Sequence, residues 1–267
     1  MKILNVYGWE AIKPATRSAL YCNWKYRAFF DSLNSRVKLS FREPPPRATT
    51  FDPVSSFLSE YAFGVPGLLW RSDQFLRASK NKEVDQYMVL RLLTELGICI
   101  GRLKHWHLMW TQGFHSRPHY RTVATSTFKT FRTLCGNFYD VFPMAYDFSC
   151  PEYETDFRIL CLCLLDLDQA IMDINKAFPQ HCQGLQLELQ LRTAENDAAT
   201  CAADLCMLIP YSSQPHNMTF ASIHSFRPLH YALRYYESQG KQLQLAWCLH
   251  VSRSLTLKYG TEIRFAE

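Results

Sequence analysis

The stretch LQLELQLRTAENDAATCAADLCMLIPY, residues 185–211, has an apolar pattern with the period of an α-helix. Apolar and small side chains recur at alternating steps of four and three residues: Leu187, Leu191, Ala194, Ala198, Cys201, Leu205 and Leu208. Polar residues fall between them, so this stripe is predicted to be buried. A helix over residues 185–209 would measure roughly 37 Å, more than the diameter of a small domain, and is therefore expected to be central. Pro210 is predicted to end it, because proline disfavours the α conformation of the preceding residue.

The helical period recurs along most of the remaining chain. Helices are predicted at residues 9–39 (one or two helices), 68–75, 84–110, 123–138, 157–178, 228–238 and 244–259. Strand-like alternation of useful length and a βαβ rhythm are both absent from the sequence. We therefore predict an all-α fold of about eight to ten helices, forming a single domain over residues 1–267.

Three segments without this period are predicted to connect the helices. Residues 42–53, REPPPRATTFDP, contain four prolines and should form an extended connector. Residues 113–121 are predicted to form a loop, and residues 142–153 a bend.

Ten cysteines occur in the chain, most of them inside apolar helical patterns. This placement favours free, buried thiols in a reducing compartment over a disulfide scaffold. A zinc site usually needs ligand pairs such as C-x-x-C, and the sequence contains none. Cys161 and Cys163 would point to different sides of a helix, so no metal is predicted there.

The formal net charge is +5, and the first 50 residues alone carry +6, with nine Lys and Arg against three Asp and Glu, while the remainder carries −1. These basic residues are spread out, which fits a solvated helix face better than a binding stripe for phosphate or an acidic partner. Neither a run of eighteen apolar residues nor a signal-peptide pattern occurs. The sequence therefore predicts neither a membrane segment nor secretion.

One polar motif on residues 185–211 could in principle hold a metal. Asn196, Thr200 and Asp204 have the N-D-x-x-T-x-x-x-D spacing of the second metal motif of class I terpene cyclases, and could hold Mg²⁺ against a diphosphate. Such enzymes also need an upstream aspartate-rich motif, but residues 72–87 offer acidic residues only at unsuitable spacing. The acidic stretch at residues 166–173, which contains Asp166, Asp168 and Asp173, is predicted to be an amphipathic helix edge. We therefore predict no metal site, no cofactor and no catalytic residue, and keep a Mg²⁺-dependent diphosphate enzyme as an alternative.

The histidines give no stronger signal for a metal or a catalytic site. His105 and His107 lie about 200° apart on a predicted helix and cannot easily share a metal. His115 and His119 flank Pro118 in a predicted loop and lack a third ligand. Nucleotide-binding, serine-hydrolase and zinc-protease motifs are absent from the sequence. Trp106 and Trp110 are predicted to belong to the core and not to a pocket.

Several short patterns, in order, resemble the α-helical regulatory region of fungal zinc-cluster transcription factors. They are VPGLLWRSDQFL (65–76), LLTELGICIGRLKHWHLMW (92–110), FPMAYDFSCPEYETDFRILCLCLLDLDQAI (142–171), AADLCMLIPY (202–211) and the tail from residue 226. In that family a helix ending in a Pro-aromatic pair is followed by a P-L-x-x-A helix and a closing helix with Trp, Gly and Ala. The matching residues here are Pro228, Leu229, Ala232, Trp247, Gly260 and Ala266.

The resemblance implies a transcription-regulator-like, non-catalytic module that contacts proteins of the transcription machinery, a related DNA-binding factor or a small-molecule effector. It also implies a nuclear location, with the cytoplasm as the alternative. The sequence lacks the six-cysteine DNA-binding cluster of the family, so direct sequence-specific DNA binding is not expected. A degenerate relative without a separate activity, or a chain whose N-terminal part is incomplete, remains an alternative.

Overall fold

The structure is a computed structural model that describes residues 28–33, 35–36, 61–79, 84–112, 119–138, 140–214 and 226–259. These residues are mostly helical, as the sequence predicts. The chain divides into two compact units, Met1–Cys99 and Ile100–Glu267, with the boundary inside helix α5 (Gln86–Gln112). The predicted connector at 42–53 and most of the predicted helix at 9–39 lie outside the described residues.

The first unit contains α4 (Val65–Ala78) and the first half of α5. Helix α4 begins three residues before its predicted start. Pro66 lies in its first turn, where backbone N–H groups have no hydrogen-bond acceptor within the helix, so the lack of an N–H in proline costs no helical hydrogen bond. Arg71 of α4 forms an ion pair with Glu95 of α5 at 2.7 Å. Phe29 packs edge-on against Phe63 with ring centroids 5.2 Å apart.

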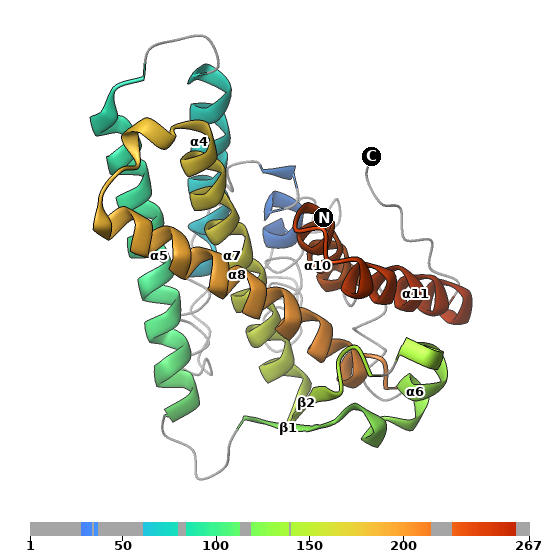
Figure 1. Cartoon of the computed structure of the whole chain (residues 1–267). Coiled ribbons are helices and arrows are strands. Elements are labelled where there is room, and N and C mark those ends of the chain that lie inside the picture. Colours follow the sequence, from blue (N-terminus) through green and yellow to red (C-terminus); the bar gives the residue numbers. More distant parts are fainter. Residues whose placement is uncertain are drawn as a thin grey trace, which may run out of the picture. The chain divides into compact units, whose positions relative to one another are not determined.

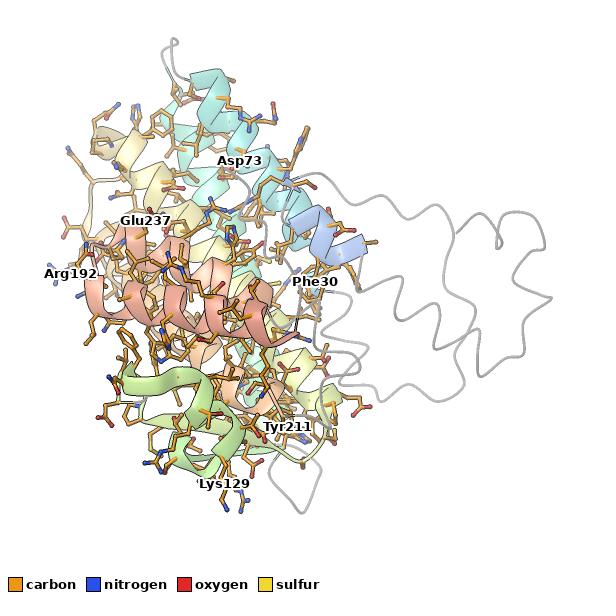
Figure 2. The ribbon with its side chains drawn as sticks, turned by 90° about the vertical axis from the view of Figure 1, so that its right-hand side faces the viewer. Phe30, Asp73, Lys129, Arg192, Tyr211 and Glu237 are labelled. Atoms are coloured by element: carbon orange, nitrogen blue, oxygen red, sulfur yellow. The ribbon has the colours of Figure 1, made fainter. Side chains whose placement is uncertain are left out.

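The second unit is built around α7 (Pro151–Ala177) and α8 (Leu185–Ser212), which pack against each other (Figure 1). Helix α10 (Phe226–Ser238) packs against α8 and against α11 (Gln242–Tyr259), and α11 also contacts α6 (Lys129–Cys135). The helical patterns of α10 and α11 are confirmed close to their predicted bounds, whereas α7 is confirmed but begins six residues before its predicted start, inside the predicted bend at 142–153. Figure 2 shows the exposed Arg192 of α8 and Lys129 of α6 on the outside of this unit.

The predicted stripe of α8 is buried over its second half. Ala194, Ala198, Cys201, Leu205 and Leu208 are at most 6% exposed. The first turns are different, since Leu187 and Leu191 are only half-buried and Leu189 is 64% exposed. The core contact of α8 therefore begins about two turns after the helix starts.

The predicted end of α8 at Pro210 is wrong, because the helix continues through this proline to Ser212. The cost of an internal proline is offset here by burial of Ile209, Pro210 and Tyr211. The carbonyl of Pro210 also accepts hydrogen bonds from the Ser213 hydroxyl and from the Gln214 side chain, both at 2.9 Å. These contacts satisfy acceptors that a helix end otherwise leaves without a partner.

A two-stranded antiparallel sheet replaces part of the helix predicted at 123–138 and part of the bend predicted at 142–153. Strand β1 (Tyr120–Ala124) pairs with β2 (Met144–Phe148), with Thr122 opposite Tyr146. A 3-10 turn (Thr125–Thr127) follows β1, so α6 is only seven residues long. The turn is tied back by the Thr125 N–H, which donates to the Pro143 carbonyl at 2.8 Å. Gly136, with φ of 55°, then ends α6 in a conformation that favours glycine.

The cysteines of the described residues are all free, as the sequence predicts. All of them except Cys99 and Cys150 are buried. Among the described helices, none combines the length and the apolar composition needed to span a lipid bilayer.

Candidate functional site

Polar side chains occur at three levels along the contact between α7 and α8, which we call the α7–α8 polar seam. On α7 they are Glu154, Cys161 and Asp168, each seven residues after the one before. Seven residues are nearly two helical turns, so all three lie on one face of α7. The facing positions on α8 run in the opposite direction, from Ser212 through Asp204 to Asp197. Buried polar groups are concentrated in the seam, which makes it the candidate functional site.

At the first level, Glu154 is held from two sides. The Ser212 hydroxyl donates a hydrogen bond to Glu154 Oε1 at 2.8 Å. Arg158, one turn further along α7, approaches Glu154 Oε2 with Nη2 at 3.5 Å, and the side chains of both are at most 7% exposed. Arg158 Nη2 also reaches the Thr155 hydroxyl at 3.3 Å, while Nε and Nη1 are buried without a hydrogen-bond partner. The pair therefore neutralises two buried charges that would be costly alone.

At the second level, the seam contacts strand β2 of the two-stranded sheet. The hydroxyl of Tyr146 on β2 donates a hydrogen bond to Asp204 Oδ1 at 2.7 Å. Burial raises the pKa of the Asp204 carboxyl to about 6, while the Tyr146 hydrogen bond acts in the opposite direction. The pKa of the Cys161 thiol is raised by burial and by the neighbouring Cys201 thiol, so Cys161 is a protonated, unreactive thiol at neutral pH.

At the third level, two carboxyl groups share one ammonium group. Lys104 of α5 forms an ion pair with Asp197 of α8. Asp168 of α7 is only 1% exposed, and its Oδ2 atom has no hydrogen-bond partner. The pKa of Asp168 is raised to about 8, first by burial and then by the charge of Asp197, while Lys104 lowers it. Asp168 is therefore mostly protonated at neutral pH, which avoids placing a second negative charge beside Asp197.

The seam corrects the sequence-based interpretation of the acidic stretch at residues 166–173. Only Asp173 lies on an exposed edge, whereas Asp166 and Asp168 are 5% and 1% exposed. The reason is that α7 is buried on nearly all sides over this stretch, so a charged residue cannot turn to solvent. The seven-residue spacing of Glu154, Cys161 and Asp168 is the sequence signal that could have indicated the seam.

The three residues of the possible Mg²⁺ motif do not come together as ligands. Asn196 and Thr200 are exposed, and the Thr200 hydroxyl donates to the Asn196 carbonyl at 2.9 Å. Asp204 instead faces Tyr146, because eight residues along a helix amount to a rotation of about 80° from the starting face. The part of the chain that the structure describes holds no group of three His, Cys, Asp or Glu side chains that could bind a metal ion.

The aromatic residues next to the seam form a packed cluster around Trp110. Its ring stacks on those of His119 and Trp106, with centroids 4.8 Å and 5.5 Å away. Trp106 and Trp110 are 1% and 3% exposed, which confirms that both belong to the core. His107 packs on Phe157 with centroids 5.5 Å apart, and burial lowers the pKa of its imidazole. His105 is exposed, while His115 lies outside the described residues.

The chemistry of the seam fits structural specificity better than catalysis. Glu154 and Asp168 are at most 5% exposed, so a substrate in solvent cannot reach either carboxyl group. A polar pair buried between two helices is satisfied only in one register, because sliding by one turn would separate its members. The seam therefore fixes α7 on α8 and places β2 against both helices.

The hydrogen bond between Tyr146 and Asp204 can be tested by Tyr146→Phe, which removes only the hydroxyl. The variant should lose about 1–3 kcal/mol of unfolding free energy, because Asp204 keeps its burial but loses its donor. Equilibrium denaturation in urea would measure the loss. Tyr87→Phe, at a site that is 65% exposed, is the matched control and should have almost no effect. Equal midpoints for both variants would show that the hydrogen bond contributes nothing to stability.

Comparisons with known proteins do not identify a relative of this chain: no family model, no curated protein and no solved structure matches it.

Proposed function

We propose that this chain is a non-catalytic interaction module of transcription regulation, which contacts protein partners or a small-molecule effector. The observation that carries the non-catalytic part is the direction of the seam carboxyl groups. Glu154, Asp168 and Asp204 all turn into the α7–α8 polar seam, where the first two are buried and Asp204 is held by Tyr146. They are engaged in holding the helices together, which leaves the outer helix faces as the surfaces available to other molecules.

The transcriptional part of the proposal rests on the sequence patterns quoted above. The AADLCMLIPY pattern lies on α8, the P-L-x-x-A pattern on α10, and Trp247 on α11. These three helices form consecutive contacts, α8 with α10 and α10 with α11. Patterns that resemble one regulatory region therefore belong to one packed assembly, which supports a common origin for them. A nuclear location follows from the same resemblance, with the cytoplasm as the alternative.

Exposed apolar side chains on the second unit offer contact surfaces for such partners. Leu108 and Met109 on α5 are 49% and 44% exposed, and Leu185 on α8 is 85% exposed. Apolar residues at the surface are common singly, but pairs such as these provide anchor points for a partner protein.

A reporter assay tests the proposed function. Fused to a heterologous sequence-specific DNA-binding domain in a fungal cell, the chain should change reporter transcription several-fold. The matched control is the same fusion with Leu205→Asp, which places an unpaired charge in the core and should abolish the effect by unfolding the module. An expressed, folded fusion without any effect on the reporter would contradict the proposal and favour a degenerate relative without separate activity.

Two binding measurements separate the remaining alternatives. Against random duplex DNA, the isolated chain should show only weak binding that falls steeply with salt, and tight sequence-selective binding would contradict the proposal. Mg²⁺ together with pyrophosphate should leave the melting temperature unchanged. A ligand present at 100 times its dissociation constant would add about 2.7 kcal/mol to the free energy of unfolding. A clear rise in the melting temperature would therefore favour the Mg²⁺-dependent enzyme.

A further inference from the structure

Two free thiols from different helices lie in contact inside the second unit. The Sγ atoms of Cys206 on α8 and Cys248 on α11 are 3.8 Å apart. Both residues are 0% exposed, and both are in the thiol form. A disulfide has its sulfur atoms about 2.05 Å apart, so a bond between the two residues requires their Sγ atoms to approach further.

We propose that Cys206 and Cys248 are an oxidisable pair that forms a disulfide between α8 and α11 when the protein is exposed to hydrogen peroxide. One thiolate attacks the peroxide, whose O–O bond breaks, giving a sulfenic acid and hydroxide, which takes up a proton to become water. The second thiolate then attacks that sulfur, so the S–S bond forms, the S–O bond breaks and a second water leaves. In sum, two thiols lose two electrons and two protons, and the peroxide is reduced to two waters.

The surroundings of the pair make this reaction slow in the closed protein. Burial and contact with Cys248 raise the pKa of the Cys206 thiol well above its usual range. The reacting species is the thiolate, so the burial of both residues and the raised pKa of Cys206 slow the reaction. Oxidation must therefore proceed through openings of α11, and the pair would respond to sustained oxidation but not to a brief pulse.

Cys206 and Cys248 are better placed for this than the other thiol pair of the unit. Cys161 and Cys201 also lie close together, but they join α7 to α8 at the centre of the unit. Exposing them would require separation of the two core helices. Helix α11 instead has an outer face, with Leu243 and Leu257 58% and 86% exposed, so local opening there costs less of the core.

Peptide mass analysis after oxidation tests the proposal directly. The full chain is incubated with hydrogen peroxide in native buffer, remaining thiols are alkylated, and the protein is cleaved before aspartate. The fragment that begins at Asp204 contains Cys206 and Cys248 and no other cysteine. After oxidation, this fragment should be lighter than its dithiol form by two hydrogen atoms and should carry no alkyl group. Reduction followed by a second alkylation should convert it to the doubly alkylated form. A low urea concentration should accelerate formation of the disulfide, because α11 opens more often.

Matched variants decide whether the bond is the proposed one. Cys248→Ala should leave Cys206 fully alkylatable, and Cys201→Ala should leave the disulfide unchanged. In the unmodified chain, the oxidised form should unfold at a higher denaturant concentration than the reduced form, because the bond restricts the unfolded chain. The proposal is overturned if this fragment stays doubly alkylated while other cysteines oxidise, or if Cys206 is instead found linked to Cys135 or Cys201.

Discussion

Replacing Leu205 by alanine should lower the free energy of unfolding by about 2–5 kcal/mol. Leu205 lies in the second half of α8, where α8 packs against α7 and α10, and it is 0% exposed. The substitution removes buried methyl groups and leaves a cavity that helices on both sides cannot easily fill. Equilibrium unfolding in urea, followed by circular dichroism, gives the difference from the unmodified chain.

Leu189→Ala is the matched control, because it makes the same change on the same helix at a side chain that is 64% exposed. Its effect should stay within about 0.5 kcal/mol, since no buried contact is lost. Similar losses of unfolding free energy for the two variants would mean that helix propensity, and not packing, determines how much these leucines of α8 contribute to stability. A loss below about 0.5 kcal/mol for Leu205→Ala would show that the stripe is not buried in solution.

The sequence predicts the long helices well because their signal is local. In α5, α7 and α8, apolar residues recur every three or four positions over many turns. This period can be recognised without knowing which element packs against the helix. The end of α8 was predicted less well. Pro210 disfavours a helix locally, but the burial of Ile209 and Tyr211 depends on packing that the local sequence does not contain.

For a related reason, the local sequence predicts neither the two-stranded sheet nor the α7–α8 polar seam. Strands β1 and β2 are five residues each, too short for a clear alternation, and their pairing joins residues twenty or more positions apart. The hydrogen bond from Tyr146 to Asp204 likewise spans 58 residues. The sequence favours an amphipathic helix edge for Asp168, because a carboxyl group is rarely buried without a partner. Its actual position follows from α7 being enclosed, a property of the whole fold.

Asp168→Asn should make the unfolding free energy less dependent on pH than it is in the unmodified chain. The pKa of Asp168 is about 8 in the folded protein, against 3.8 for an unperturbed Asp. At pH values between these two pKa values, the folded chain binds a proton that the unfolded chain has lost. Raising the pH therefore favours the unfolded chain, and the unfolding free energy decreases. The decrease can reach about 1.4 kcal/mol per pH unit and should level off above about pH 8.

The asparagine variant has nearly the same shape and stays neutral at every pH, so the excess stability of this variant over the unmodified chain should increase from pH 4 to pH 8. Urea denaturation at several pH values across this range measures the difference directly. Asp173→Asn, on the exposed side of the same helix, is the matched control. Taking differences between variants also removes the contribution of Asp204, whose pKa is raised to about 6. Parallel profiles for Asp168→Asn and Asp173→Asn would mean that Asp168 is ionised inside the folded protein. Lys104 would then be the ammonium group next to two carboxylates, those of Asp168 and Asp197.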